Sequence, residues 1–212
     1  MSEPGRGRGR LTFRRFAGLD RSGPPPPETL PGAPLRPWTV PNAIGFLRLA
    51  LIPVFLWSAW RADGAGAAPA ALFAVISWGD YADGIAARLT GQYSRLGAML
   101  DPVVDRLLVI GGILVCWRFD LLPAWLLATL VVREALMLVL GAIVVPRGVE
   151  LRINWWGRWG VWPAMSAIFF GLVGLRGLGS VLLAVGVALL LIASVEYVRA
   201  ALPQLTGGKT ST

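Results

Sequence analysis

Hydrophobic residues lie along this chain in long runs, separated by short stretches that hold charged residues, glycine and proline. A helix needs about 20 apolar residues to cross a bilayer. The runs predict six transmembrane helices, at 43–60, 69–89, 98–118, 123–145, 155–175 and 178–200. The chain is therefore predicted to be an all-α integral membrane protein, with one membrane domain at 39–202 and a flexible tail at 203–212.

The first 38 residues follow a different pattern. They contain the basic stretch RGRGRLTFRR and the proline-rich stretch SGPPPPETLPGAP, which predict a disordered cytoplasmic tail without helix. An arginine-rich organelle transit sequence is the alternative, and the acidic residues Glu3, Asp20 and Glu28 count against it. No apolar core follows the basic start, so we expect no signal peptide.

Composition supports the membrane prediction. Only 15% of the residues are charged, against about a quarter in soluble domains. The net charge of +8 could indicate nucleic-acid binding, but the arginines flank apolar runs, and we expect no nucleic-acid partner. The chain has one cysteine, Cys116, and no histidine, which excludes a disulfide framework and a Cys/His metal site. General base catalysis would therefore fall to carboxylates.

Arginines are concentrated in the first 38 residues and in the loops after the second and fourth predicted helices. Positive loops stay on the cytoplasmic side of a membrane. Both termini and these two loops are therefore predicted to face the cytoplasm, in a multi-pass protein of the plasma membrane. The second predicted helix then ends, and the third begins, at the cytoplasmic surface.

Four aspartates interrupt these two helices. Asp80 and Asp83 share one face of the second helix, and Asp101 and Asp105 share one stripe of the third. A short turn, within LTGQYSRL, joins the helices, so they should be antiparallel neighbours. The spacing predicts that the four carboxylates converge.

Such a cluster needs counter-charge. An aspartate at the centre of a membrane helix costs about 3 kcal/mol, and like charges repel one another. Two divalent cations, Mg²⁺ or Mn²⁺, would meet both costs, because hard oxygen ligands suit them and a two-metal site suits phosphoryl chemistry. Structural salt bridging is the alternative, for which too few cations are expected at a matching depth.

Neighbouring residues could complete a substrate site. Gly84 and Gly97 would leave room beside the aspartates, or would serve helix packing. Arg88 could clamp a phosphate, or could anchor the helix at the cytoplasmic surface.

The residues of this region form the pattern D-x2-D-G-x2-A-R-x8-G-x3-D-x3-D, and every fixed position resembles the signature of the CDP-alcohol phosphatidyltransferase family. The fixed positions are Asp80, Asp83, Gly84, Ala87, Arg88, Gly97, Asp101 and Asp105. The stretch TVPNAIGFLRLALIPVF also resembles the family's first-helix motif. Pro41, Asn42, Ile44 and Arg48 match that motif, whereas Gly45 replaces its usual hydroxyl residue.

The resemblance implies a fold of six transmembrane helices and a reaction. Members move a phosphatidyl group from CDP-diacylglycerol to an alcohol and release CMP. By position, Asp80, Asp83, Asp101 and Asp105 would bind the metals, and Asp105 would also be the general base. The implied CDP-binding residues are Asn42, Asp83, Gly84, Ala87, Arg88 and Gly97. The family also suggests a homodimer.

The acceptor alcohol is less determined. REALMLVLG and NWWGRWG resemble segments of phosphatidylglycerophosphate synthases, which implies glycerol 3-phosphate. Gly141 and Gly160 stand where those enzymes often carry basic residues, which would instead suit phosphatidylglycerol, as in cardiolipin synthases. A phosphatidylinositol-phosphate synthase is a weaker alternative. Candidate acceptor-binding residues are Arg48, Arg95, Arg133, Arg152 and Arg158.

Two alternative functions lie outside this family. A membrane prenyltransferase also uses aspartate-rich helices, but its two motifs lie far apart in sequence. A divalent-cation transporter would need a polar path across the bilayer, which the apolar outer halves of these helices do not offer.

Overall fold

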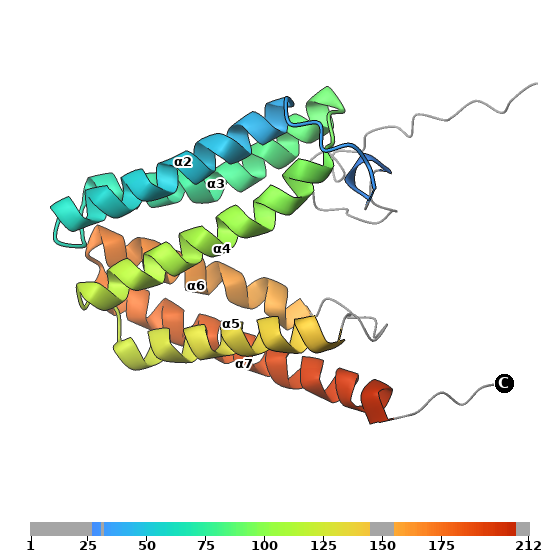
Figure 1. Ribbon diagram of the computed structural model, residues 1–212. Coiled ribbons are helices and arrows are strands. Elements are labelled where there is room, and N and C mark those ends of the chain that lie inside the picture. The colour runs from blue at the N-terminus through green and yellow to red at the C-terminus, as the bar shows by residue number, and fades with distance from the viewer. Residues whose placement is uncertain (1–26, 31, 145–154, 207–212) are drawn as a thin grey trace, which may run out of the picture. The chain divides into compact units, whose positions relative to one another are not determined.

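The computed structural model describes residues 27–30, 32–144 and 155–206. These residues contain one 3₁₀ turn, η1 (Pro27–Thr29), six α-helices and no strand (Figure 1). The helices are α2 (Val40–Arg61), α3 (Ala67–Thr90), α4 (Arg95–Arg118), α5 (Ala124–Val144), α6 (Trp155–Val173) and α7 (Arg176–Thr206). The prediction of an all-α protein with six long helices is thereby confirmed for the described residues.

Two boundaries differ from the sequence prediction. The proline-rich segment was expected to lack helix, yet it forms the single turn η1, because proline fits the first position of a helical turn. Helix α7 continues to Thr206, past the predicted end at 200. Residues 1–26 of the predicted tail and the final residues 207–212 lie outside the described ranges.

Hydropathy separates the helices into two kinds. Three described segments are long and apolar enough to cross a membrane: Val40–Arg61, Ala124–Ala142 and Arg176–Ala200. The apolar part of α6, Trp159–Val173, is shorter. Helices α3 and α4 have 24 residues each, ample length at 1.5 Å per residue, but their aspartates and arginines reduce their hydropathy. The chain is a membrane protein whose most polar helices carry the conspicuous motif.

The chain divides into two compact units. The first unit comprises Met1–Pro53 and Val75–Leu108, and therefore holds the N-terminal part of α2, the C-terminal part of α3 and the N-terminal part of α4. Side chains cap the first turns of α2 and α4 in this unit. Thr39 Oγ1 accepts the Asn42 N–H at 3.3 Å, and Ser94 Oγ accepts the Gly97 N–H at 2.9 Å. Gly91, at φ 64, provides the left-handed turn between α3 and α4.

The second unit comprises Val54–Ala74 and Val109–Thr212. Small residues let α6 and α7 approach closely, because a Cβ at Gly186 would lie only 2.8 Å from the Ala164 nitrogen. Two aromatic pairs add contacts within this unit. Phe55 packs on Phe73 with a centroid distance of 5.7 Å, and a tryptophan of α2 meets Phe119 edge-on.

Candidate active site

The first unit buries polar side chains where a membrane protein would ordinarily bury apolar ones. Asn42, Arg48, Asp83 and Ser94 are buried there. Asp80 and Asp83 come from α3, Asp101 and Asp105 from α4, and Arg48 from α2. Burying polar groups is costly unless they are paired, so their contacts define the site.

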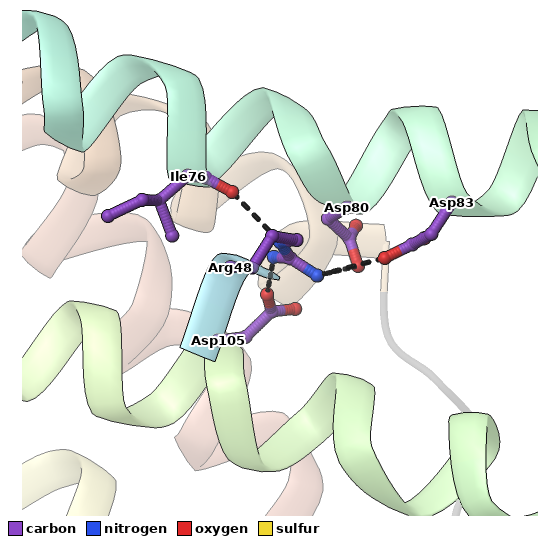
Figure 2. Close-up of polar contacts among 5 residues, drawn as sticks. All are labelled: Arg48, Ile76, Asp80, Asp83 and Asp105. Carbon is purple, nitrogen blue, oxygen red and sulfur yellow. Dashed lines mark hydrogen bonds and ion pairs between the residues drawn. The ribbon is translucent and has the colours of Figure 1, made fainter. Parts of the chain in front are cut away.

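The guanidinium of Arg48 lies among the carboxylates (Figure 2). Its Nη1 is 3.1 Å from Asp83 Oδ2 and 3.5 Å from Asp80 Oδ1. Its Nη2 donates to Asp105 Oδ1 at 2.5 Å, and its Nε donates to the Ile76 carbonyl oxygen at 2.9 Å. The Arg48 side chain is only 3% exposed, so this is a buried ion-pair network that ties α2 to α3 and α4.

A glycine makes room for this arginine. A Cβ at Gly79 would lie 2.7 Å from Arg48 Cδ, closer than van der Waals contact allows. Gly79 directly precedes Asp80 and is one helical turn after Ile76. The stem of Arg48 therefore passes over the bare backbone of α3 to reach the carboxylates.

The network corrects one sequence expectation. Too few cations were expected at the depth of the aspartates to form salt bridges, yet Arg48 forms three. Arg48 was also named as a candidate for acceptor binding; in the structure its Nε, Nη1 and Nη2 donate to Ile76, Asp83 and Asp105. The reason is its long side chain, which reaches neighbouring helices.

The aspartates differ in accessibility. Asp83 is 6% exposed, whereas Asp80 and Asp105 are 47% and 48% exposed. Asp101 lies one turn before Asp105, is partly buried, and makes no hydrogen bond or salt bridge to any residue that the structure describes. The helices thus bring all four to one part of the first unit, and three of them contact the same guanidinium.

The cluster has the ligand type that a divalent cation prefers, but its side chains are not placed to bind one. Four carboxylates suit a hard dication. Within the described ranges, however, no group of three acidic side chains is placed to hold a metal ion, and a guanidinium is the cation that they contact. Binding of a metal by three of them requires a rearrangement around Arg48.

Asn42 and Gly97 form a second contact between α2 and α4. Asn42 Nδ2 donates to the carbonyl oxygens of Arg36 and Pro37 at 3.0 and 3.1 Å, and its Oδ1 accepts the Ser94 hydroxyl at 2.8 Å. A Cβ at Gly97 would lie 2.7 Å from that Oδ1. The space beside Gly97 is therefore filled by Asn42, which supports the helix-packing alternative at this glycine.

Gly84 and Arg88 lie together on α3. The Arg88 guanidinium lies over Gly84, with Nη1 3.5 Å from the place of a Cβ. Arg88 Nε is buried and has no hydrogen-bond partner among the described residues. An orphaned buried donor of this kind is suited to an anionic ligand. Ala87 is partly buried beside it.

No described contact joins the remaining candidate residues for acceptor binding to one another. Arg95 begins α4 and is partly buried. Arg133, in the second unit, donates to Ser194 Oγ at 2.9 Å and pairs with Glu134. Arg152 lies outside the described residues. Arg158 belongs to α6, and its side chain is also outside the described set.

Three glycines that depart from the family pattern have distinct surroundings. A Cβ at Gly45 would lie 2.8 Å from Leu100 Cδ2, so Leu100 fills the place of the usual hydroxyl. At Gly160 a Cβ would be 2.9 Å from Leu190 Cγ and 3.1 Å from its backbone nitrogen, which leaves no room for a lysine without displacing α7. Gly141 faces open space among the described residues.

Sequence reasoning missed Gly79 and Ser94. Ser94 could have been found from the sequence, because serine is a preferred N-cap residue and lies in the turn before the third predicted helix. Gly79 had only its position next to Asp80 as a signal.

Comparison with known proteins agrees with this site. The sequence profile of the CDP-alcohol phosphatidyltransferases matches residues 38–192. A Mycobacterium tuberculosis protein named for cardiolipin synthesis is 45% identical over 103 residues, 48% of each chain. The match therefore spans about half the length of that relative.

Two relatives match over longer stretches. A Mycobacterium tuberculosis protein named for phosphatidylglycerophosphate synthesis is 30% identical over 174 residues, 78% of this chain and 83% of that protein. The CDP-diacylglycerol–glycerol-3-phosphate 3-phosphatidyltransferase of Bacillus subtilis is 30% identical over 144 residues, 62% of this chain and 75% of that protein. With the profile covering most of the chain and the signature residues gathered in one unit, this protein belongs to the CDP-alcohol phosphatidyltransferase family.

Proposed function

We propose that this protein transfers a phosphatidyl group from CDP-diacylglycerol to an alcohol and releases CMP. The observation that carries the proposal is the gathering of the signature aspartates of α3 and α4 in one unit of a family member. In the reaction, the acceptor oxygen forms a bond to the phosphorus of the phosphatidyl group, and the bond from that phosphorus to the oxygen of CMP breaks.

Asp105 is the proposed general base. Its side chain is 48% exposed, and one of its oxygens accepts from Arg48. The other oxygen is therefore available to take the proton of the acceptor hydroxyl.

The pyrophosphate would lie against α3. Gly84 offers bare backbone, and Arg88 offers a buried Nε without a partner among the described residues. We propose that Arg88 donates to a phosphate oxygen of the CDP moiety, with Gly84 and Ala87 lining the same site. Asn42, Asp83 and Gly97 stay within the proposed site as residues that position α2, α3 and α4.

We propose Mg²⁺ or Mn²⁺ as cofactor, two ions held by Asp80, Asp83, Asp101 and Asp105. Bound ions would supply positive charge that neutralises the pyrophosphate and stabilises the CMP leaving group. The support is the donor set, four carboxylates in a chain without histidine.

Glycerol 3-phosphate is the proposed acceptor. The Mycobacterium tuberculosis relative named for phosphatidylglycerophosphate synthesis and the Bacillus subtilis relative match over larger shares of their length than the Mycobacterium tuberculosis relative named for cardiolipin synthesis. Phosphatidylglycerol is the second candidate. It is favoured by that relative's higher identity, and by Gly160, whose surroundings leave no room for a basic side chain.

The arginine distribution supports a plasma-membrane location with both termini and the aspartates near the cytoplasmic face, and the family suggests a homodimer.

The test is an acceptor assay with the full chain in detergent or membranes. CDP-diacylglycerol and Mn²⁺ are supplied with labelled glycerol 3-phosphate, phosphatidylglycerol or inositol phosphate, and CMP release and label in the lipid fraction are followed. We expect CMP release that depends on glycerol 3-phosphate, with the label in lipid. CMP release only with phosphatidylglycerol would establish the second candidate. The absence of CMP release with every one of these alcohols would refute the transferase proposal.

A further inference from the structure

The cation among the aspartates is part of the protein itself. One guanidinium contacts three carboxylates from two helices, and a fourth carboxylate lies one helical turn away. A single positive charge cannot compensate four ionised carboxylates, so the cluster needs a further cation or protons besides Arg48, its only described cationic partner.

Arg48 is also held firmly in its place. Three of its nitrogens are engaged, the Nε by a backbone carbonyl that is independent of the carboxylates. Its stem lies over Gly79, where any side chain would collide with it. The position is therefore built for this arginine, and Figure 2 shows the guanidinium pointing into the space that the three carboxylates surround.

We propose that Arg48 is the resident counter-ion of the aspartate cluster, and that it competes with a divalent cation for Asp80, Asp83 and Asp105. The inference rests on the proposed function in one respect, that the cluster binds such a cation. In the metal-free protein the guanidinium keeps the buried carboxylates compensated. A metal gains the carboxylates only when Arg48 releases them, and this lowers the apparent affinity for the metal.

A purely structural Arg48 would behave differently. It would hold the three helices together with or without metal, and its loss would loosen the carboxylates and weaken metal binding. Competition predicts the opposite sign, because the loss of Arg48 frees the carboxylates and leaves them uncompensated. The metal affinity of an Arg48 variant therefore separates the two roles.

The test is titration of the purified full-length protein in detergent with Mn²⁺ alone, with free Mn²⁺ measured by electron paramagnetic resonance. For Arg48→Met we expect a Kd for Mn²⁺ lower by about tenfold, equivalent to about 1.4 kcal/mol. The matched control is Arg106→Met, which removes an exposed arginine of α4 that forms no described salt bridge, and should leave the Kd near that of the wild type. In EDTA, Arg48→Met should unfold at a lower temperature than the wild type, and Mn²⁺ should raise its Tm by more.

A second variant keeps the proposal decisive if Arg48→Met does not fold. Gly79→Ala changes no charge but places a methyl group 2.7 Å from Arg48 Cδ, so it should loosen the guanidinium and tighten Mn²⁺ binding. Unchanged or weaker Mn²⁺ binding in Arg48→Met, or in Gly79→Ala where Arg48→Met fails to fold, would overturn the competition. CMP release by the wild type in that case would leave the proposed reaction standing. Absence of Mn²⁺ binding in the wild type and the variants would overturn this inference and the proposed cofactor together.

Discussion

At the scale of single residues, Asp83 and Asp105 share one partner but have different surroundings. Both accept from Arg48, yet Asp83 is enclosed and Asp105 is about half exposed. An enclosed, paired carboxylate is suited to hold helices together, because leaving its partner unpaired costs about 3–5 kcal/mol. An accessible carboxylate with one oxygen free is suited to proton transfer. We therefore expect Asp83 to serve positioning and Asp105 to serve proton transfer.

Replacing Asp105 tests this division. Asp105→Asn keeps the shape of the side chain and an oxygen for the Arg48 Nη2, but cannot take a proton. We expect CMP release to fall by about 10²–10⁴-fold, the usual contribution of a general base, while CDP binding is largely retained. Single-turnover CMP release and equilibrium CDP binding measure the two effects. The control is Asp63→Asn, in the turn after α2 at φ 50, where asparagine is equally tolerated. Near-normal turnover in Asp105→Asn would rule out its role as base.

At the scale of helices, glycines determine how α2, α3 and α4 approach one another. Gly45 and Gly97 bring α4 against α2, and Gly79 admits Arg48 to α3. Gly84 differs, because the nearest atoms to a Cβ there are the ends of its own helix's Arg88. Gly45, Gly79 and Gly97 therefore serve packing, and Gly84 is the one that we expect to face a substrate.

This difference predicts opposite results for two alanines. The methyl group of Gly97→Ala would lie 2.7 Å from Asn42 Oδ1 and would push that atom away. We expect this overpacking to lower the free energy of unfolding by about 1–3 kcal/mol. Gly84→Ala meets only ordinary contacts at 3.5 Å and should fold normally, but its methyl group should raise the KM for CDP-diacylglycerol. Thermal unfolding in detergent and steady-state CMP release measure the two effects. Equal stability of Gly97→Ala and the wild type would contradict the packing assignment.

The helices themselves were predictable from sequence, and the network among them was not. Long apolar runs and the prolines and glycines between them determine where helices start, as Pro123 does directly before α5. The gathering of the four aspartates follows from helical periodicity and a short turn. The partnership of Arg48 does not, because it depends on the depth of α2 relative to two other helices and on the absence of a side chain at Gly79.

At the scale of the whole molecule, the orientation in the membrane can be tested with the chain's own chemistry. Cys116 is the only cysteine and is buried, so Cys116→Ala provides a background without thiols. In that background, Asp63→Cys places a thiol in the turn after α2, and Gln92→Cys places one in the turn after α3, both at exposed positions. An impermeant thiol reagent added to intact cells should label the first and not the second, if the arginine-rich loops are cytoplasmic. The reverse labelling would invert the predicted topology.

The pairing of Arg48 has a further consequence for how the protein is made. Its partner Asp83 follows 35 residues later in the chain, and Asp105 follows 57 residues later. During synthesis, α2 thus reaches the translocon with an uncompensated positive charge, which is costly in lipid. That cost is relieved only once α3 and α4 have emerged from the ribosome. We therefore expect the three helices to leave the insertion site as one group rather than one after another.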